Sequence, residues 1–205
     1  MPALYSKRYR DALDDAAKLH RRQVRKGTDV PYVSHLLHVS ALVWESGGTE
    51  DQAIAALLHD AVEDQGGDKV LRKIRERYGK RVAKMVWACT DSATTKRKAK
   101  GPWVERKTRH LAALADASEE ALLIVAADKV VNVEAIVADL QQHSRTVWDR
   151  FNAPPESIIW YHQAAYELLA ARLGSDTALV RRLDRGVGLL AVWAAVPRSS
   201  ARPAA

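Results

Sequence analysis

The segment ALLHDAVEDQGG, residues 56–67, places one histidine and three acids at the end of an apolar run. His59 and Asp60 are adjacent, and Glu63 and Asp64 follow about one helical turn later. Burying so many acids costs several kcal/mol per charge unless a cation neutralises them. The spacing therefore predicts a divalent metal site near the end of a helix, with Glu63 and Asp64 placed to orient or deprotonate a water molecule.

A metal ion needs more donors than this one segment offers. His35 lies in the apolar segment YVSHLLHVSALV, and Asp128 interrupts the apolar run ALLIVAADKVV, where an unpaired carboxylate is costly. With His59 and Asp60 they make a set of two imidazoles and two carboxylates, which suits Mn²⁺, Fe²⁺ or Zn²⁺. The candidate metal ligands are therefore His35, His59, Asp60 and Asp128.

Composition favours one globular domain. The chain has 205 residues, 47% of them hydrophobic, and we expect a single domain over residues 1–196 followed by a disordered tail at 197–205. The single cysteine excludes an internal disulfide framework and fits a reducing compartment. The sequence shows no apolar leader segment, and its longest apolar run is too short to span a bilayer. We therefore expect a cytoplasmic protein without a membrane partner.

The charge pattern favours a polyanionic ligand. The chain carries 32 basic and 25 acidic residues, which gives a net charge of +7. Basic residues cluster at 21–26 and at 96–101, as nucleotides, nucleic acids or acidic surfaces would require, although solvated surface faces explain such clusters equally well.

Hydrophobic periodicity and capping residues predict helices along most of the chain. Thr49 to Gln52 reads as a capping box that opens a helix running to about Asp64, and Ser118 reads as the cap of another helix. The polar stretch 90–102 reads as a loop that ends at Pro102, the expected first residue of the next helix. The expected helical ranges are 4–24, 35–48, 49–64, 68–78, 80–92, 102–115, 118–140, 156–173 and 176–194.

Three segments together resemble a known family. They are RRQVRKGTDVPYVSHLLHVSALV (21–43), AIAALLHDAVED (53–64) and AADKVVNVEAIVADL (126–140). The sequence is similar to the HD-domain phosphohydrolases, in particular the RelA/SpoT-like small alarmone hydrolases, a branch that includes the metazoan SpoT homologue. This resemblance implies an all-α HD-domain helical bundle that binds Mn²⁺ and removes the 3′-diphosphate of (p)ppGpp as pyrophosphate.

The same resemblance assigns roles to individual residues. It implies that His35, His59, Asp60 and Asp128 hold the Mn²⁺ ion, although other divalent metals remain open. It implies that Glu63 and Asp64 are the catalytic pair. The residues that it places near the base and phosphates of the substrate are Arg25, Lys26 and Asn132.

Some positions depart from the family pattern. Leu36 stands where a proline is usual, and Val130 and Val131 replace the usual leucine and histidine of that motif. These changes spare the expected ligands and fall near the expected base pocket. An adenine alarmone such as (p)ppApp, or another phosphorylated nucleotide such as NADPH, is therefore an alternative substrate to the guanine alarmone.

Two other classes of function remain open from the sequence. The chain could be an HD-type nucleotidase or phosphatase that releases orthophosphate, or a non-catalytic module that binds nucleotides or nucleic acid. The intact Glu63 and Asp64 favour an enzyme acting on a small nucleotide over a nucleic-acid-binding protein. The sequence leaves open whether the chain forms a homo-oligomer.

Overall fold

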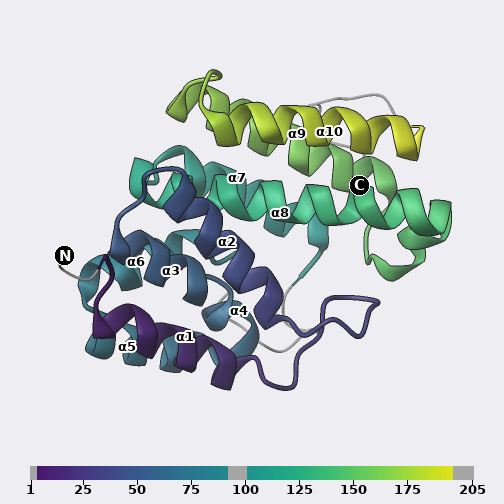
Figure 1. Ribbon diagram of the computed structural model, residues 1–205. Helices are drawn as coiled ribbons and strands as arrows, with labels where there is room; N and C mark the ends of the chain where they lie inside the picture. Colours follow the sequence, from purple (N-terminus) through teal and green to yellow (C-terminus); the bar gives the residue numbers. More distant parts are fainter. Residues whose placement is uncertain (1–3, 92–100, 196–205) are drawn as a thin grey trace. The chain divides into compact units, whose positions relative to one another are not determined.

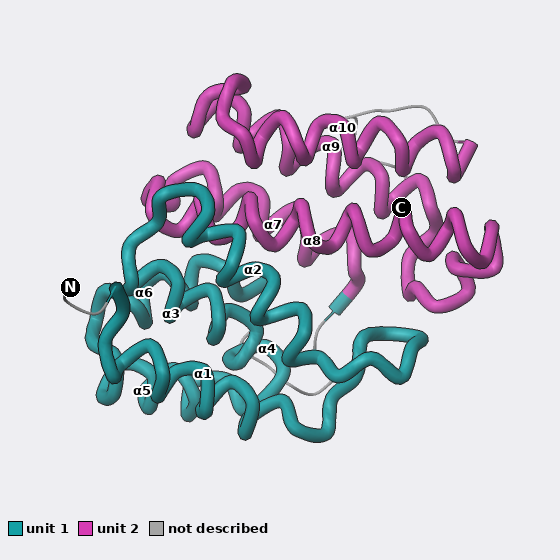
Figure 2. Tube along the Cα trace, viewed as in Figure 1, with its two compact units in different colours: residues 1–101 teal, residues 102–205 magenta. Residues whose placement is uncertain are grey.

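The computed structural model describes residues 4–91 and 101–195, which belong to two compact units (Figures 1 and 2). Unit 1 covers residues 1–101 and unit 2 covers residues 102–205. The described residues form helices, and their β-pairing is limited to an isolated bridge between Val24 and Pro31. The expected all-α fold is confirmed. A single domain over residues 1–196 stays a prediction, and the expected tail at 197–205 lies outside the described residues.

Unit 1 is built around one short helix whose far half is buried on every side. This helix, α3, runs from Glu50 to Leu58, and each of its residues from Gln52 onward is buried. It packs against α1, α2 and α6, while α5 packs against α4 and α6 (Figure 1). The Thr49–Gln52 capping box that opens α3 is present as expected. The other helices of the unit are α1 (Lys7–Leu19), α2 (Val33–Glu45), α4 (Ala61–Gln65), α5 (Gly67–Tyr78) and α6 (Lys80–Cys89).

The expected continuous helix from Thr49 to Asp64 is wrong, because the chain breaks at His59 and Asp60. Helix α3 ends at Leu58 and α4 begins at Ala61. The His59 imidazole bonds back to the Ala56 carbonyl, with 2.7 Å between Nδ1 and O. The Asp60 backbone lies at φ −92° and ψ −4°, in the bridge region between helix and strand. Both side chains are therefore presented at a bend rather than along one regular helix.

The expected helix over 4–24 ends early, and a hairpin-like loop follows it. Helix α1 stops at Leu19 because the next residues pair with the chain that returns toward α2. The Arg25 amide donates to the Val30 carbonyl at 2.8 Å, and the Tyr32 amide donates to the Gln23 carbonyl at 2.9 Å. This loop, residues 20–32, holds Arg25 and Lys26 outside any helix.

Unit 2 is built around the long helix α8, which packs against α9, α10 and the 3₁₀ helix η2 (Figure 1). Ser118 caps α8 as expected, because its side chain accepts a hydrogen bond from the Ala121 amide. Gly186 allows α10 to approach α8 closely, since a β-carbon there would lie 2.8 Å from the Val133 side chain. The elements are α7 (Trp103–Ala115), α8 (Glu119–His143), η2 (Ser144–Arg150), α9 (Pro155–Leu173) and α10 (Ala178–Ala194).

The remaining helix predictions agree with the structure to within a few residues at the ends. Pro102 is the residue before α7 rather than its first residue, and η2 was not expected from the sequence. Most of the expected loop at 90–102, including its basic cluster, lies outside the described residues. None of the helices that the structure describes combines the length and the apolar character of a membrane span.

A histidine lies in the core of unit 2. His162 on α9 is buried, and its Nδ1 has no hydrogen-bond partner among the described residues. Burial, and then the nearby positive charge of Lys129, lower the pKa of His162 to about 3. The imidazole is therefore neutral in the folded protein throughout the physiological pH range.

This buried histidine predicts a pH dependence of stability. The unfolded chain takes up a proton at this histidine near its ordinary pKa of about 6.5, while the folded protein resists protonation down to about pH 3. Its contribution to the free energy of unfolding is therefore fully present above pH 6.5. It falls by up to about 1.4 kcal/mol per pH unit below that value. Urea unfolding at pH 7, 6 and 5 should show a smaller acid loss for His162→Leu than for the unmodified chain.

The matched control is His143→Gln, which changes an exposed histidine at the end of α8. It should keep the acid dependence of the unmodified chain. If His162→Leu lost stability with falling pH as steeply as the control does, the buried neutral histidine would not be a source of the effect.

Candidate functional site

Two buried imidazoles face each other in unit 1. His35 comes from the first turn of α2, and His59 comes from the bend after α3. Their Nε2 atoms lie 3.3 Å apart, and both side chains are almost completely buried. Asp60 Oδ2 lies 3.0 Å from His59 Nε2 and 3.5 Å from His35 Nε2. The structure thus brings together three of the predicted ligands, which we call the HD cluster: His35, His59 and Asp60.

The tautomer of His59 suits a metal ligand. Its Nδ1 lies 2.7 Å from the Ala56 carbonyl oxygen, an atom that can only accept, so Nδ1 carries the proton. The Nε2 atom of the neutral ring then presents a lone pair toward His35 and Asp60. A backbone carbonyl that fixes the far nitrogen in this way is a common support for a metal-binding histidine. The donor set of the HD cluster therefore fits a divalent cation.

Tyr32 holds the carboxylate of the cluster in place. Its hydroxyl donates to Asp60 Oδ2 at 2.5 Å. The tyrosine ring stacks on His20, with ring centres 5.3 Å apart and planes at 18°, and it also packs against His35 at 5.3 Å. Burial, partly offset by the bond to Gln23, lowers the pKa of His20, so a neutral ring supports this tyrosine. Tyr32 therefore orients Asp60 from the loop side of the cluster.

The predicted catalytic acids lie on the short helix α4, directly after the cluster. The Asp64 amide donates to the Asp60 carbonyl at 3.0 Å, so these two residues keep the expected i,i+4 relation. Asp64 Oδ2 accepts a hydrogen bond of 2.8 Å from Gln23 Nε2, and Glu63 is half-buried. The bend at His59 removes that histidine from the helix, so the expected i,i+4 relation between His59 and Glu63 on one continuous helix is wrong.

The predicted phosphate-binding cations of unit 1 lie in the loop that also carries Tyr32. Arg25 is half-buried, and its guanidinium carbon lies 6.0 Å from the centre of the Tyr32 ring. That is the outer limit for a cation–π contact. Lys26 is exposed. Arg25 is thus brought near the residue that orients Asp60, while Lys26 reaches solvent.

In unit 2, Asp128 is engaged through both carboxylate oxygens. Lys129 Nζ donates to Oδ2 at 2.6 Å, and Asn132 Nδ2 donates to Oδ1 at 2.6 Å. The predicted substrate residue Asn132 therefore contacts a predicted ligand one helical turn away. Lys129 offsets the cost of burying Asp128 within unit 2, so this cost does not by itself require a metal ion. Asp128 as the fourth ligand stays a prediction.

Sequence reasoning missed the cation that pairs with Asp128. Lys129 is buried in the middle of α8. Burial alone would lower the pKa of Lys129, but the charge of Asp128 and the contact with Tyr161 outweigh it and raise the pKa well above its ordinary value. Lys129 Nζ lies 5.2 Å from the Tyr161 ring centre, and Lys107 Nζ from α7 lies 4.9 Å from the same ring. Two ammonium groups thus lie against one aromatic ring in unit 2.

The missed supporting residues carried weak signals in the sequence. Tyr32 precedes His35 by three residues, and Lys129 directly follows Asp128. Neither position follows from helical periodicity, because one lies in a loop and the other lies among apolar residues. Gln23, which bonds to Asp64 across 41 positions in the sequence, gave no local signal at all.

Known proteins resemble this chain over most of its length. A family model described as an HD domain matches residues 12–175. Guanosine-3′,5′-bis(diphosphate) 3′-pyrophosphohydrolase of Aquifex aeolicus (strain VF5) is 35% identical over 125 residues. That match covers 61% of this chain and 17% of the relative, so the chain corresponds to a small part of this longer protein.

Two solved structures are similar to the chain as well. One, titled as a metazoan ortholog of SpoT that hydrolyses ppGpp and plays a role in starvation responses, has a TM-score of 0.68 and 29% identity. The match covers 90% of this chain and 96% of that one. The other, lmo0812 from Listeria monocytogenes EGD-e, has a TM-score of 0.62 and 25% identity and covers 75% and 96% of the two chains.

The family match explains the geometry of unit 1. HD domains bind divalent metals, and the facing imidazoles with their adjacent carboxylate are the part of this chain that fits such an ion. The family model spans most of the chain and includes all three residues of the HD cluster. This chain therefore belongs to the HD-domain family.

Proposed function

We propose that this chain is a metal-dependent hydrolase that removes the 3′-diphosphate of (p)ppGpp or a closely related alarmone, giving GDP or GTP and pyrophosphate. The observation that carries the proposal is the HD cluster, in which two buried Nε2 atoms and one aspartate oxygen converge within 3.5 Å. The similarity to a metazoan ortholog of SpoT whose title states that it hydrolyses ppGpp supports this substrate class.

The metal in this proposal is Mn²⁺, held by His35, His59, Asp60 and Asp128. Imidazole and carboxylate donors without cysteine suit such an ion, and they disfavour a closed structural zinc site. When bound, the ion would polarise a water molecule and lower its pKa. The chain's own contribution is to fix the donors: the Ala56 carbonyl sets the His59 tautomer, and the Tyr32 hydroxyl holds Asp60.

Glu63 and Asp64 are the groups that we assign to the water. They orient it toward the phosphorus bonded to the 3′ oxygen and accept the proton that it loses. The bond between that phosphorus and the 3′ oxygen breaks, the 3′ oxygen takes up a proton, and pyrophosphate leaves. Gln23 holds one oxygen of Asp64, which fixes its orientation. General acid–base help of this kind contributes about 10²- to 10⁴-fold to a rate.

Arg25, Lys26 and Asn132 are assigned to the nucleotide. Arg25 offers a planar guanidinium suited to stacking on a base or to a two-point phosphate contact, and Lys26 offers a mobile charge. Asn132 is oriented by its bond to Asp128. Val130 and Val131, which replace the usual residues of that motif, bear on the choice between guanine and adenine. The single cysteine is in keeping with a cytoplasmic enzyme acting on a small nucleotide.

The test of the proposed function is product analysis. The protein is incubated with ppGpp, pppGpp, ppApp, NADPH and simple mononucleotides, each with Mn²⁺, Mg²⁺ or Zn²⁺, and the products are separated by chromatography. We expect pyrophosphate and the matching 5′-phosphorylated nucleotide from an alarmone with Mn²⁺. Orthophosphate as the product would instead assign the chain to the HD-type phosphatases, and the absence of turnover on the whole panel would contradict hydrolysis.

Substitutions within the site separate metal binding from proton transfer. Asp60→Ala removes a ligand, so Mn²⁺ affinity and turnover should both be lost. Glu63→Gln keeps the shape but cannot accept a proton, so Mn²⁺ affinity should persist while kcat falls by about 10²-fold or more. Calorimetry with Mn²⁺ and steady-state hydrolysis of ppGpp measure the two effects. Hydrolysis by Glu63→Gln at the unmodified rate would show that Glu63 is not the proton acceptor.

Tyr32→Phe tests the support of Asp60. Removing one hydroxyl leaves the ligands in place but loosens the carboxylate, so Mn²⁺ affinity should fall by about 10- to 100-fold. The matched control is Tyr5→Phe, at an exposed tyrosine that is distant from the cluster in sequence. Equal Mn²⁺ affinity in the two variants would mean that the Tyr32 hydroxyl does not position Asp60.

A further inference from the structure

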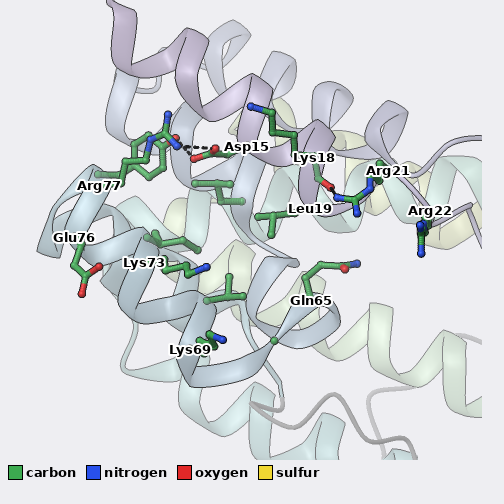
Figure 3. Close-up of a pocket in the computed structure, with 15 residues that line it drawn as sticks. Asp15, Lys18, Leu19, Arg21, Arg22, Gln65, Lys69, Lys73, Glu76 and Arg77 are labelled. Atoms are coloured by element: carbon green, nitrogen blue, oxygen red, sulfur yellow. Dashed lines mark hydrogen bonds and ion pairs between the residues drawn. The ribbon is translucent and has the colours of Figure 1, made fainter.

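Unit 1 contains a second hollow, lined by residues outside the HD cluster. It is a cleft of about 890 Å³ between the end of α1 and the facing side of α5, with Gln65 of α4 at one side (Figure 3). That volume is within the range of small-molecule sites, which is roughly 300–1,000 Å³. Of the residues assigned to the proposed reaction, none lines this cleft. It is therefore a separate feature of the unit.

The cleft is strongly basic. Six cations and two carboxylates line it. The cations come from both walls, so a ligand in the cleft would be approached by positive charge from two sides. The cations are Lys18, Arg21 and Arg22 at the end of α1, and Lys69, Lys73 and Arg77 on α5.

Neither carboxylate offsets the charge in the open part of the cleft. Asp15 is held by Arg77 at 2.8 Å and by the Tyr78 hydroxyl at 2.6 Å (Figure 3). The carboxylate of Glu76 is directed away from the space between the two walls, whereas the Lys73 side chain extends toward it (Figure 3). The acids therefore leave the centre of the cleft positive.

Three of the lining cations have no ion-pair partner in the described part of the chain: Arg22, Lys69 and Lys73. Lys69 and Lys73 stand on successive turns of α5, about 6 Å apart along the helix. Arg22 belongs to the opposite wall (Figure 3). Unpaired cations at this spacing on two walls match the repeat of charged groups along a chain of phosphates, each of which accepts charge-assisted hydrogen bonds.

The floor of the cleft distinguishes between classes of anion. It is formed by aliphatic side chains, including Leu58, Val70 and Ile74, and these are already buried. The aromatic residue in the lining is Tyr78, whose hydroxyl bonds to Asp15. A strand of nucleic acid is usually held by aromatic rings on which its bases stack, and the lining does not provide such a platform. A short phosphate chain needs only the cations.

We propose that this cleft between α1 and α5 is a second anion site that binds a small polyphosphorylated molecule through Arg22, Lys69 and Lys73, separately from the HD cluster. Its ligand class is a linear di- or triphosphate group, whether inorganic or carried by a nucleotide. The site does not depend on the proposed hydrolysis, since none of the cations that form it takes part in that reaction.

The test uses inorganic tripolyphosphate titrated into the full chain by calorimetry, with EDTA present so that metal binding plays no part. The double variant Lys69→Gln, Lys73→Gln should weaken binding at one site by about tenfold or more, as expected for the loss of two charge-assisted contacts. The matched control is Arg75→Gln, Lys80→Gln, which removes the same charge at exposed positions outside the cleft. It should leave the affinity within about twofold.

Further arms separate the alternatives. Asp60→Ala should keep this binding, whereas loss of binding in that variant would place the phosphate chain at the HD cluster and overturn the proposal. Equal weakening in the cleft variant and the control variant would mean that net charge alone is sensed. Orthophosphate binding as tightly as tripolyphosphate, or displacement of tripolyphosphate by an oligothymidylate of higher affinity, would likewise overturn a site for small phosphate chains. ATP and free tripolyphosphate compared in the same titration distinguish the two sources of the ligand.

Discussion

The approach of His35 Nε2 to His59 Nε2, 3.3 Å apart and out of contact with water, is the constraint that organises unit 1. Two imidazoles in such a place need fixed tautomers and a group that satisfies both lone pairs. The fold meets the first need through the Ala56 carbonyl, and it places the Asp60 carboxylate beside both rings. These groups can be held so closely because α3, which ends at His59, is enclosed by α1, α2 and α6.

Unit 2 handles its buried charge differently. Asp128 is placed in the most apolar stretch of α8, where Lys129 and Asn132 of the same helix engage both of its oxygens. Lys129 in turn lies against Tyr161, which Lys107 also approaches. The result is a buried ion pair with an aromatic lid inside unit 2. Removing either partner would leave an uncompensated charge, and such a loss costs about 3–5 kcal/mol.

Local signals were enough to predict the helices and most of the chemistry. The Thr49–Gln52 capping box and the Ser118 cap both start helices where the sequence places them. The approach of His35, His59 and Asp60 in space also agrees with the expectation from residue types. These features depend on neighbours in the sequence or on a few chemically distinctive residues, and for that reason a single sequence reveals them.

Features that depend on distant contacts could not be predicted. The apolar run through His59 and Asp60 has no glycine or proline to mark a break, yet the chain bends there because side chains bond to Ala56 and Tyr32. The early end of α1 likewise follows from pairing with residues that come later in the chain. Asp128 was expected to need a cation from elsewhere, and its nearest one is the adjacent Lys129.

The complete burial of α3 has a consequence for how this protein can change. The side chains of Ile54 and Leu57 are core packing for unit 1, and the same helix delivers His59 to the site. A substitution that adjusts the site from behind would therefore also weaken the unit, because large-to-small changes in a packed core cost about 2–5 kcal/mol. The loop at 20–32 carries no such burden, since most of its side chains reach solvent. Divergence of substrate preference, in nature or in the laboratory, has its open route through that loop.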